Sequence, residues 1–210
     1  MSLLTKKAVL IFCLIFIFSI QHSYSQDETN KWVFGIGLNT VDFYPTNDPG
    51  NGNTKGMFNQ FANAIDHWNV FLPKISATRH IKNKFSIEAA VSVNNITKLG
   101  ENKIDNTLYF SIDGALQYVL FNDSRKLAPF VYAGGGYTWM DWYGAGTINA
   151  GLGTKYWIGS NFGLDVQAGY KYSDQKYEQL LSHFYYALSA VFTFGRRSKS
   201  KWGGNANNCY

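Results

Sequence analysis

Charged side chains in this chain of 210 residues recur inside segments that alternate between apolar and polar residues. Residues 161–174, with the sequence NFGLDVQAGYKYSD, place Asp165 and Lys171 on one parity and mainly apolar side chains on the other. Successive side chains of a β-strand point to opposite faces of the sheet. The charged face meets water in a soluble sheet, whereas it turns inward in a small barrel surrounded by lipid. The chemistry open to these charges is ion pairing, and its location depends on the fold.

A short turn predicts which charges meet. If residues 159–161 join two antiparallel strands, Lys155 lies opposite Asp165. The same register sets Asn149 opposite Lys171. A buried charge without a partner is costly, so inward-facing charges need such pairing. We therefore predict an ion network in the lumen made of Glu88, Asp113, Lys155, Asp165 and Lys171. We interpret this network as structural; the alternative is a gated path for protons or ions.

Residues suited to catalysis or metal binding are few. Beyond residue 25 the histidines are His67, His80 and His183, without HxH, HExxH or paired-cysteine spacing. Because these spacings are missing, the sequence predicts no metal site, and we expect no cofactor. Ser182 and His183 are the nearest approach to a nucleophile and base, but adjacent strand residues point to opposite faces. We therefore expect that the protein is not an enzyme and has no catalytic residues.

Eight segments with a period of two could position these side chains. They cover approximately residues 31–40, 67–80, 85–94, 107–121, 128–141, 147–158, 161–174 and 183–195. The second segment loses its alternation around Pro73 and Lys74, which indicates a bulge or an end outside the bilayer. The fifth has apolar or small residues on both faces. The inward phase of these two segments therefore stays open.

The connections between the segments alternate in length. IKNK, NDSRKL and GSN are short, whereas residues 41–67, 95–106 and 173–182 form longer connections, with DWYGAG as a short exception. Short turns at one end and long loops at the other are typical of outer-membrane barrels. We predict an all-β fold: an eight-stranded antiparallel transmembrane up-and-down β-barrel with a short periplasmic C-terminal tail. Side chains fill a barrel of this size, so no open pore is expected. The alternative is a soluble, lipocalin-like barrel with an apolar lumen.

Residues 31–195 resemble the OmpA-like and OmpX-like outer-membrane barrels. The resemblance rests on the alternating strands, on the Gly-rich PFVYAGGGY, and on YALSAVFTF, where Phe192 and Phe194 resemble the signal read by the barrel-assembly machinery. It implies a place in the outer membrane, contact with its lipid, and both termini in the periplasm. The signal usually ends the chain or precedes a peptidoglycan-binding domain, whereas GRRSKSKWGGNANNCY follows it here. A peptidoglycan-anchoring role is therefore not indicated.

The two ends of the sequence differ from the barrel segment. Residues 1–25 have Lys6 and Lys7 before an apolar run and then Ser-Tyr-Ser, which predicts a secretory signal peptide. The run is too short for a membrane anchor. Removing it takes two lysines from the formal charge of +5, and residues 196–210 carry four Lys and Arg residues, so residues 26–195 have a net charge of −1. The basic character belongs to a flexible periplasmic tail, and nucleic acid is not an expected partner.

Two further sets of residues are candidates for binding a partner. The tail offers Arg196, Arg197, Lys199, Lys201, Trp202 and Cys209. In the first long loop, an amphipathic helix at the barrel mouth is predicted by the spacing of Phe58, Phe61, Ile65 and Trp68. This helix is either a lid packed over the barrel or a surface for a membrane or a partner.

The sequence therefore favours a non-enzymatic structural or scaffold component of an envelope complex for secretion or assembly, with a plugged lumen and protein partners in the periplasm or outer membrane. It is similar in size and topology to PorG-type barrels of the type IX secretion system. One alternative is an adhesion or defence barrel of the OmpX kind that acts through its extracellular loops. Another is a lipid-modifying enzyme of the outer membrane, to which the Ser182 and His183 pair is the nearest approach.

Overall fold

The computed structural model describes residues 32–43, 67–99, 102–121, 126–159, 161–173 and 180–194. The predicted signal peptide, the predicted tail with its six candidate residues, and Phe58, Phe61 and Ile65 of the predicted mouth helix lie outside the described residues. Within the described part of the chain, no helix is long and apolar enough to cross a membrane.

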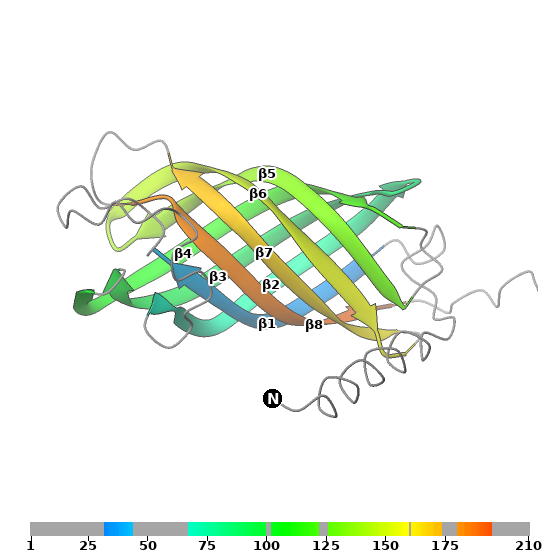
Figure 1. Cartoon of the computed structure of the whole chain (residues 1–210), viewed down its shortest axis with the longest axis horizontal. Helices are drawn as coiled ribbons and strands as arrows, with labels where there is room; N and C mark the ends of the chain where they lie inside the picture. Colours follow the sequence, from blue (N-terminus) through cyan, green and yellow to red (C-terminus); the bar gives the residue numbers. More distant parts are fainter. Residues whose placement is uncertain are drawn as a thin grey trace, which may run out of the picture.

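Eight antiparallel strands form one closed barrel, in which each strand pairs with the next and the last pairs with the first. Figure 1 shows the strands running obliquely along the barrel. Their bounds are β1 (Trp32–Asp42), β2 (Asn69–Lys82), β3 (Phe85–Leu99), β4 (Asn102–Val119), β5 (Leu127–Met140), β6 (Tyr143–Trp157), β7 (Phe162–Ser173) and β8 (His183–Thr193). The predicted eight-stranded up-and-down barrel is confirmed.

The apolar parity faces outward and the polar parity faces inward. On β6, Ile148 and Leu152 are 66% and 63% exposed, whereas Lys155 is 5% exposed. A closed barrel satisfies all strand hydrogen bonds internally, so an apolar outer face can contact hydrocarbon. The opposite arrangement, with an apolar lumen and a polar outer face, is excluded.

Aromatic residues gather near both ends of the outer face. On β8, Phe184 and Tyr186 stand at one end and Phe192 at the other, with Leu188 and Ala190 between them. Other strands follow the same order; β4, for example, runs from Phe110 through aliphatic residues to Tyr118. Aromatic girdles that flank an aliphatic band mark the two interfaces of a membrane-spanning barrel.

The two ends of the barrel differ in their connections (Figure 1). The terminal end is the end at which β1 begins and β8 ends, and it carries the β2–β3, β4–β5 and β6–β7 turns. The loop end carries the other four connections. At the terminal end, the β6–β7 turn gives the expected register, with Lys155 opposite Asp165 and Asn149 opposite Lys171.

One predicted loop is wrong. Residues 95–99 and 102–106 of the predicted loop at 95–106 instead form the outer part of the β3–β4 hairpin, where Ile96 pairs with Thr107 and Leu99 pairs with Asn102. This part of the hairpin extends beyond the pairs that β3 makes with β2 and beyond those that β4 makes with β5. It therefore lies outside the wall that alternates between apolar and polar residues, and its polar composition resembles that of a loop.

The strand pairing determines which side chains of the second and fifth segments, β2 and β5, face inward. The register of β2 against β1 shifts between Gly37 and Asn39, opposite Pro73, which confirms the bulge. The shift turns Lys74 into the lumen. On β5, Phe130 and Thr138 face inward and Val131 and Tyr137 face outward.

Candidate functional site

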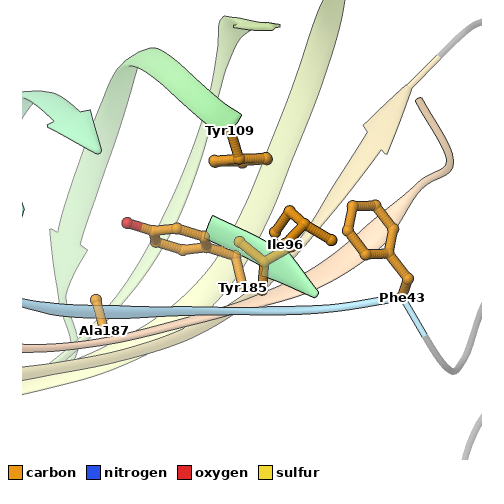
Figure 2. Close-up of a cluster of buried hydrophobic side chains, with 6 residues drawn as sticks. Phe43, Ile96, Tyr109, Tyr185 and Ala187 are labelled. Carbon is orange, nitrogen blue, oxygen red and sulfur yellow. The ribbon is translucent and has the colours of Figure 1, made fainter. Parts of the chain in front are cut away.

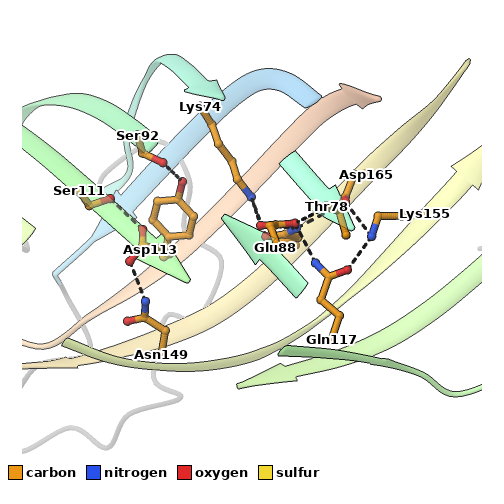
Figure 3. Close-up of polar contacts among 12 residues, drawn as sticks. Lys74, Thr78, Glu88, Ser92, Ser111, Asp113, Gln117, Asn149, Lys155 and Asp165 are labelled. Carbon is orange, nitrogen blue, oxygen red and sulfur yellow. Dashed lines mark hydrogen bonds and ion pairs between the residues drawn. The ribbon is translucent and has the colours of Figure 1, made fainter. Parts of the chain in front are cut away.

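The lumen holds a polar cluster centred on Glu88 of β3, which is 5% exposed (Figure 3). Its carboxylate lies 3.4 Å from Lys74 Nζ and accepts hydrogen bonds from Gln117 Nε2 at 2.8 Å and Gln167 Nε2 at 3.0 Å. Thr78 Oγ1 donates to it at 3.3 Å. Alternation on β2, β3, β4 and β7 turns these side chains toward one point.

Lys155 joins the same cluster from β6. Its Nζ donates to Gln117 Oε1 at 2.7 Å and lies 3.7 Å from Asp165 Oδ2 (Figure 3). The ammonium group also stands 4.6 Å from the centre of the Phe130 ring. We call this set the Glu88 network: Lys74, Thr78, Glu88, Gln117, Lys155, Asp165 and Gln167. It contains two lysines and two carboxylates, so its charges balance without an external ion.

A second cluster lies nearer the loop end and is centred on Asp113 of β4. Lys171 Nζ lies 2.7 Å from one carboxylate oxygen. Asn149 Nδ2 donates to the other at 2.7 Å, as Figure 3 shows. Ser111 completes this set, the Asp113 network, by donating to Asp113 and accepting from Lys171. Lys171 therefore pairs with a carboxylate on β4 rather than with Asn149 opposite it. This network also holds one positive and one negative charge.

Buried apolar clusters lie in the lumen toward both ends. Val33, Trp157 and Val191 form a buried cluster near the terminal end. At the loop end a larger buried cluster contains Val41, Phe43, Ile96, Tyr109, Tyr185 and Ala187 (Figure 2). We call these two clusters the terminal-end layer and the loop-end layer. Buried polar side chains lie beside both of them, such as His80 and Thr193 at the terminal end and Asn39 and Thr138 at the loop end, so packed apolar and polar side chains together fill the lumen.

His183 lies in the wall of the loop-end layer. Its Nε2 is 3.1 Å from Tyr109 Oη, and its Nδ1 is 3.0 Å from the Leu181 carbonyl oxygen. Ser182 Oγ instead accepts the backbone N–H of Ser173 at 3.0 Å. The imidazole and the neighbouring hydroxyl thus bond to different groups. Within the described ranges, no three His, Cys, Asp or Glu side chains are grouped so that they could hold a metal ion.

Several lumen residues were missed by the sequence analysis. Lys74, Gln117 and Gln167 take part in most of the contacts of the Glu88 network, yet only Glu88, Lys155 and Asp165 were expected there. Gln117 and Gln167 occupy inward positions of clearly alternating strands, and this signal could have found them. Lys74 could not be assigned because the bulge at Pro73 breaks the alternation before it.

Three asparagines beside the loop-end layer form another unexpected group. Asn94 Nδ2 donates to Asn39 Oδ1 at 2.7 Å and to the Asn69 carbonyl oxygen at 2.8 Å. The Asn69 side-chain oxygen accepts the backbone N–H groups of Thr97 and Lys98, at 2.9 and 3.0 Å. Asn69 thereby accepts hydrogen bonds from β3 in a part of that strand that lies beyond its last residue paired with β2, which is Ser92.

The described member of the predicted mouth helix is Trp68. Its ring stacks on Tyr186, with centroids 4.8 Å apart, and Tyr186 belongs to the outward face of β8. Trp68 therefore joins the aromatic girdle at the loop end. The part of the predicted lid that the structure describes packs against the outer face of the wall.

Comparison with known proteins places the fold. No family model matches the sequence, and no curated protein matches it. Among solved structures, the outer membrane protein OprG from Pseudomonas aeruginosa is 11% identical with a TM-score of 0.53, covering 83% of this chain and 100% of that one. Neisserial surface protein A (NspA) is 15% identical with a TM-score of 0.52, covering 79% of this chain and 96% of that one. The chain has the fold of these barrels.

Proposed function

We propose that the protein is a non-enzymatic barrel of the outer membrane that serves as a structural or scaffold component of an envelope complex. The observation that carries the proposal is the filled lumen. The lysines and carboxylates of the two networks balance each other, and a buried apolar cluster lies toward each end. A filled lumen of this kind stabilises the wall of the barrel. It leaves the two rims of the barrel as the surfaces through which the protein can bind a partner.

The tail is the proposed contact with a protein partner. The described chain enters and leaves the barrel at the terminal end, and residues 196–210 come after this exit in the sequence. We place this end in the periplasm because short turns face the periplasm in outer-membrane barrels. The basic residues of the tail then suit an acidic periplasmic surface. A component of the type IX secretion system of the PorG kind is the narrowest form of this proposal, supported by size and strand number.

Crosslinking in intact cells tests the scaffold role. Affinity purification of the full chain should recover defined periplasmic or outer-membrane proteins, and a chain ending at residue 195 should lose them while remaining folded. A matched variant with Arg196, Arg197, Lys199 and Lys201 all changed to Gln separates the charge of the tail from its length. Recovery of the same proteins with the shortened chain would contradict the proposed contact.

A second function, surface adhesion, is favoured by the β3–β4 hairpin. Residues 103–107 of β4 pair with β3, but β5 begins to pair with β4 only at Tyr109. Within the described residues, no strand covers the other side of this segment. An uncovered strand edge can pair with an extended segment of another protein. Joining Ile96 to Thr107 through a two-residue turn should abolish ligand binding by whole cells if adhesion is the function, and should leave tail-dependent partners in place.

A further inference from the structure

The outer rim of the terminal end carries a cluster of cations. Arg79 and Lys82 on β2 are exposed, and Lys84 and Lys126 are half-buried in the adjoining turns. Among the described residues of this end, the outer face has no acidic side chain; Glu88 and Asp165 point into the lumen. The loop end differs, because there Lys98 and Lys103 stand beside Asp105 and Asp141. Among the described residues of the outer face, positive charge therefore outweighs negative charge at the terminal end and is balanced at the loop end.

Two of these cations are held against aromatic residues of the girdle. The Arg79 guanidinium lies 5.5 Å from the centre of the Trp32 ring, across the β1–β2 pair. The Lys84 ammonium lies 5.8 Å from the Tyr118 ring and donates to the Leu120 carbonyl oxygen at 3.2 Å. Contact with an aromatic face positions a cation and favours it energetically. Both groups therefore stand at the level of the girdle before any ligand arrives.

The aromatic girdle determines which part of the bilayer lies next to these cations. Aromatic girdles lie at the headgroup level of a bilayer, with the aliphatic band in hydrocarbon. A guanidinium at that level can donate two parallel hydrogen bonds to a phosphate, and a neighbouring ammonium supplies a compact charge. In a zwitterionic headgroup an ammonium group already neutralises the phosphate. In an anionic headgroup the phosphate keeps its negative charge and can pair with the cations of the protein.

We propose that the rim formed by Arg79, Lys82, Lys84 and Lys126 is a binding surface for anionic phospholipid headgroups in the leaflet that meets the terminal end. Arg79 over Trp32 and Lys84 over Tyr118 are its two anchoring points. The inference rests on the proposed placement of the barrel in a membrane, but it is independent of the partner of the tail.

Lipid titration of the folded full-length protein in detergent tests this surface. The probes are phosphatidylglycerol and phosphatidylcholine with identical acyl chains, and bound lipid is counted by native mass spectrometry. Wild type should bind phosphatidylglycerol more tightly. One cation near an anionic lipid surface contributes about a fivefold change in affinity, so Arg79→Gln with Lys84→Gln should weaken phosphatidylglycerol binding at least about tenfold. The control Lys103→Gln, at the loop end, should bind like wild type.

Two further measurements keep the test decisive. The charge-conserving pair Arg79→Lys and Lys84→Arg should retain the preference, which separates charge from damage to the fold. Glycerol phosphate without acyl chains should compete weakly; equal competition would show that free phosphate is the ligand and overturn the lipid assignment. An unchanged preference in the double Gln variant would overturn the site. A chain that inserts into vesicles yet shows no headgroup preference refutes this inference alone, whereas one that inserts into no vesicle refutes the proposed membrane placement.

Discussion

The carboxylate of Glu88 shows how a charge is kept inside this wall. Four side chains from three other strands reach it, and only one of them, Lys74, is charged. Two glutamines act as links, because each donates to an acid and accepts from a lysine. An unpaired charge in such surroundings is strongly destabilising, while a fully bonded network fixes one arrangement. The neutral amides are therefore as necessary to the network as the ion pairs.

Lys155 offers the sharpest test at this scale. Lys155→Met should strand the Asp165 carboxylate, whose Oδ2 lies 3.7 Å from Lys155 Nζ and whose Oδ1 accepts no hydrogen bond among the described residues. The change should lower the free energy of unfolding by about 3 to 5 kcal/mol. Adding Asp165→Leu should recover much of this loss because the uncompensated charge is removed. Urea unfolding in lipid vesicles, followed by tryptophan fluorescence, measures both values.

The control for this pair is Lys103→Met, at an exposed position of the β3–β4 hairpin. It should change the unfolding free energy by less than about 0.5 kcal/mol. Losses that simply add in the Lys155 and Asp165 double variant would show that these two residues do not stabilise each other.

At the scale of the strand, alternation was sufficient to predict most of the barrel. It assigned the inward face of β3, β4, β6, β7 and β8, and the short turn at residues 159–161 fixed a register that the structure confirms. It failed where periodicity carries no information. The outer part of the β3–β4 hairpin, at residues 95–99 and 102–106, extends beyond the pairs with β2 and β5 and lacks the apolar alternation of the wall. The bulge in β2 reverses the phase within one strand. Pairing across non-adjacent strands, such as Glu88 with Gln167, depends on barrel curvature, which no local pattern encodes.

Close approach of β1 and β8 gives a prediction for a single strand. A Cβ atom at Gly37 would overlap the Leu188 carbonyl oxygen and the Ser189 Cα on β8, both of them backbone atoms that cannot rotate away. Gly37→Ala should therefore destabilise the barrel by about 1 to 3 kcal/mol. The fraction of folded protein can be read from the difference in gel mobility between unboiled and boiled samples during refolding.

Gly146→Ala is the matched control, since a Cβ atom there meets nothing within 4 Å. It should refold like wild type. Equal yields for the two alanine variants would show that the β1–β8 contact tolerates a methyl group and that its tightness does not limit stability.

For the barrel as a unit, the filled lumen predicts that no ions are conducted. Folded protein in a planar bilayer should give no uniform conductance steps, because buried side chains fill the interior of a barrel of eight strands. A boiled sample serves as the control for leakage. Regular steps of one size from folded protein, absent after boiling, would contradict the filled lumen and favour the gated ion path.

The tail supplies the other prediction at this scale. Cys209 is the remaining cysteine once residues 1–25 are removed, and an odd cysteine in an oxidising compartment can form a bridge to another chain. Non-reducing electrophoresis of native membranes should show a larger species that contains this chain and disappears on reduction. Cys209→Ser should lack it. If the wild-type chain is entirely monomeric and its thiol is labelled completely by maleimide, the predicted bridge to another chain is wrong and the tail is a spacer.

The distribution of the Glu88 network over the wall bears on how the barrel assembles. Its seven residues come from β2, β3, β4, β6 and β7, and none comes from β1 or β8. A curved sheet that is still open between its first and last strands can therefore already neutralise these charges. The final joining step then aligns the backbone ladders of β1 and β8, with Gly35 and Gly37 among the residues of the seam, while the charges of the Glu88 network are already paired.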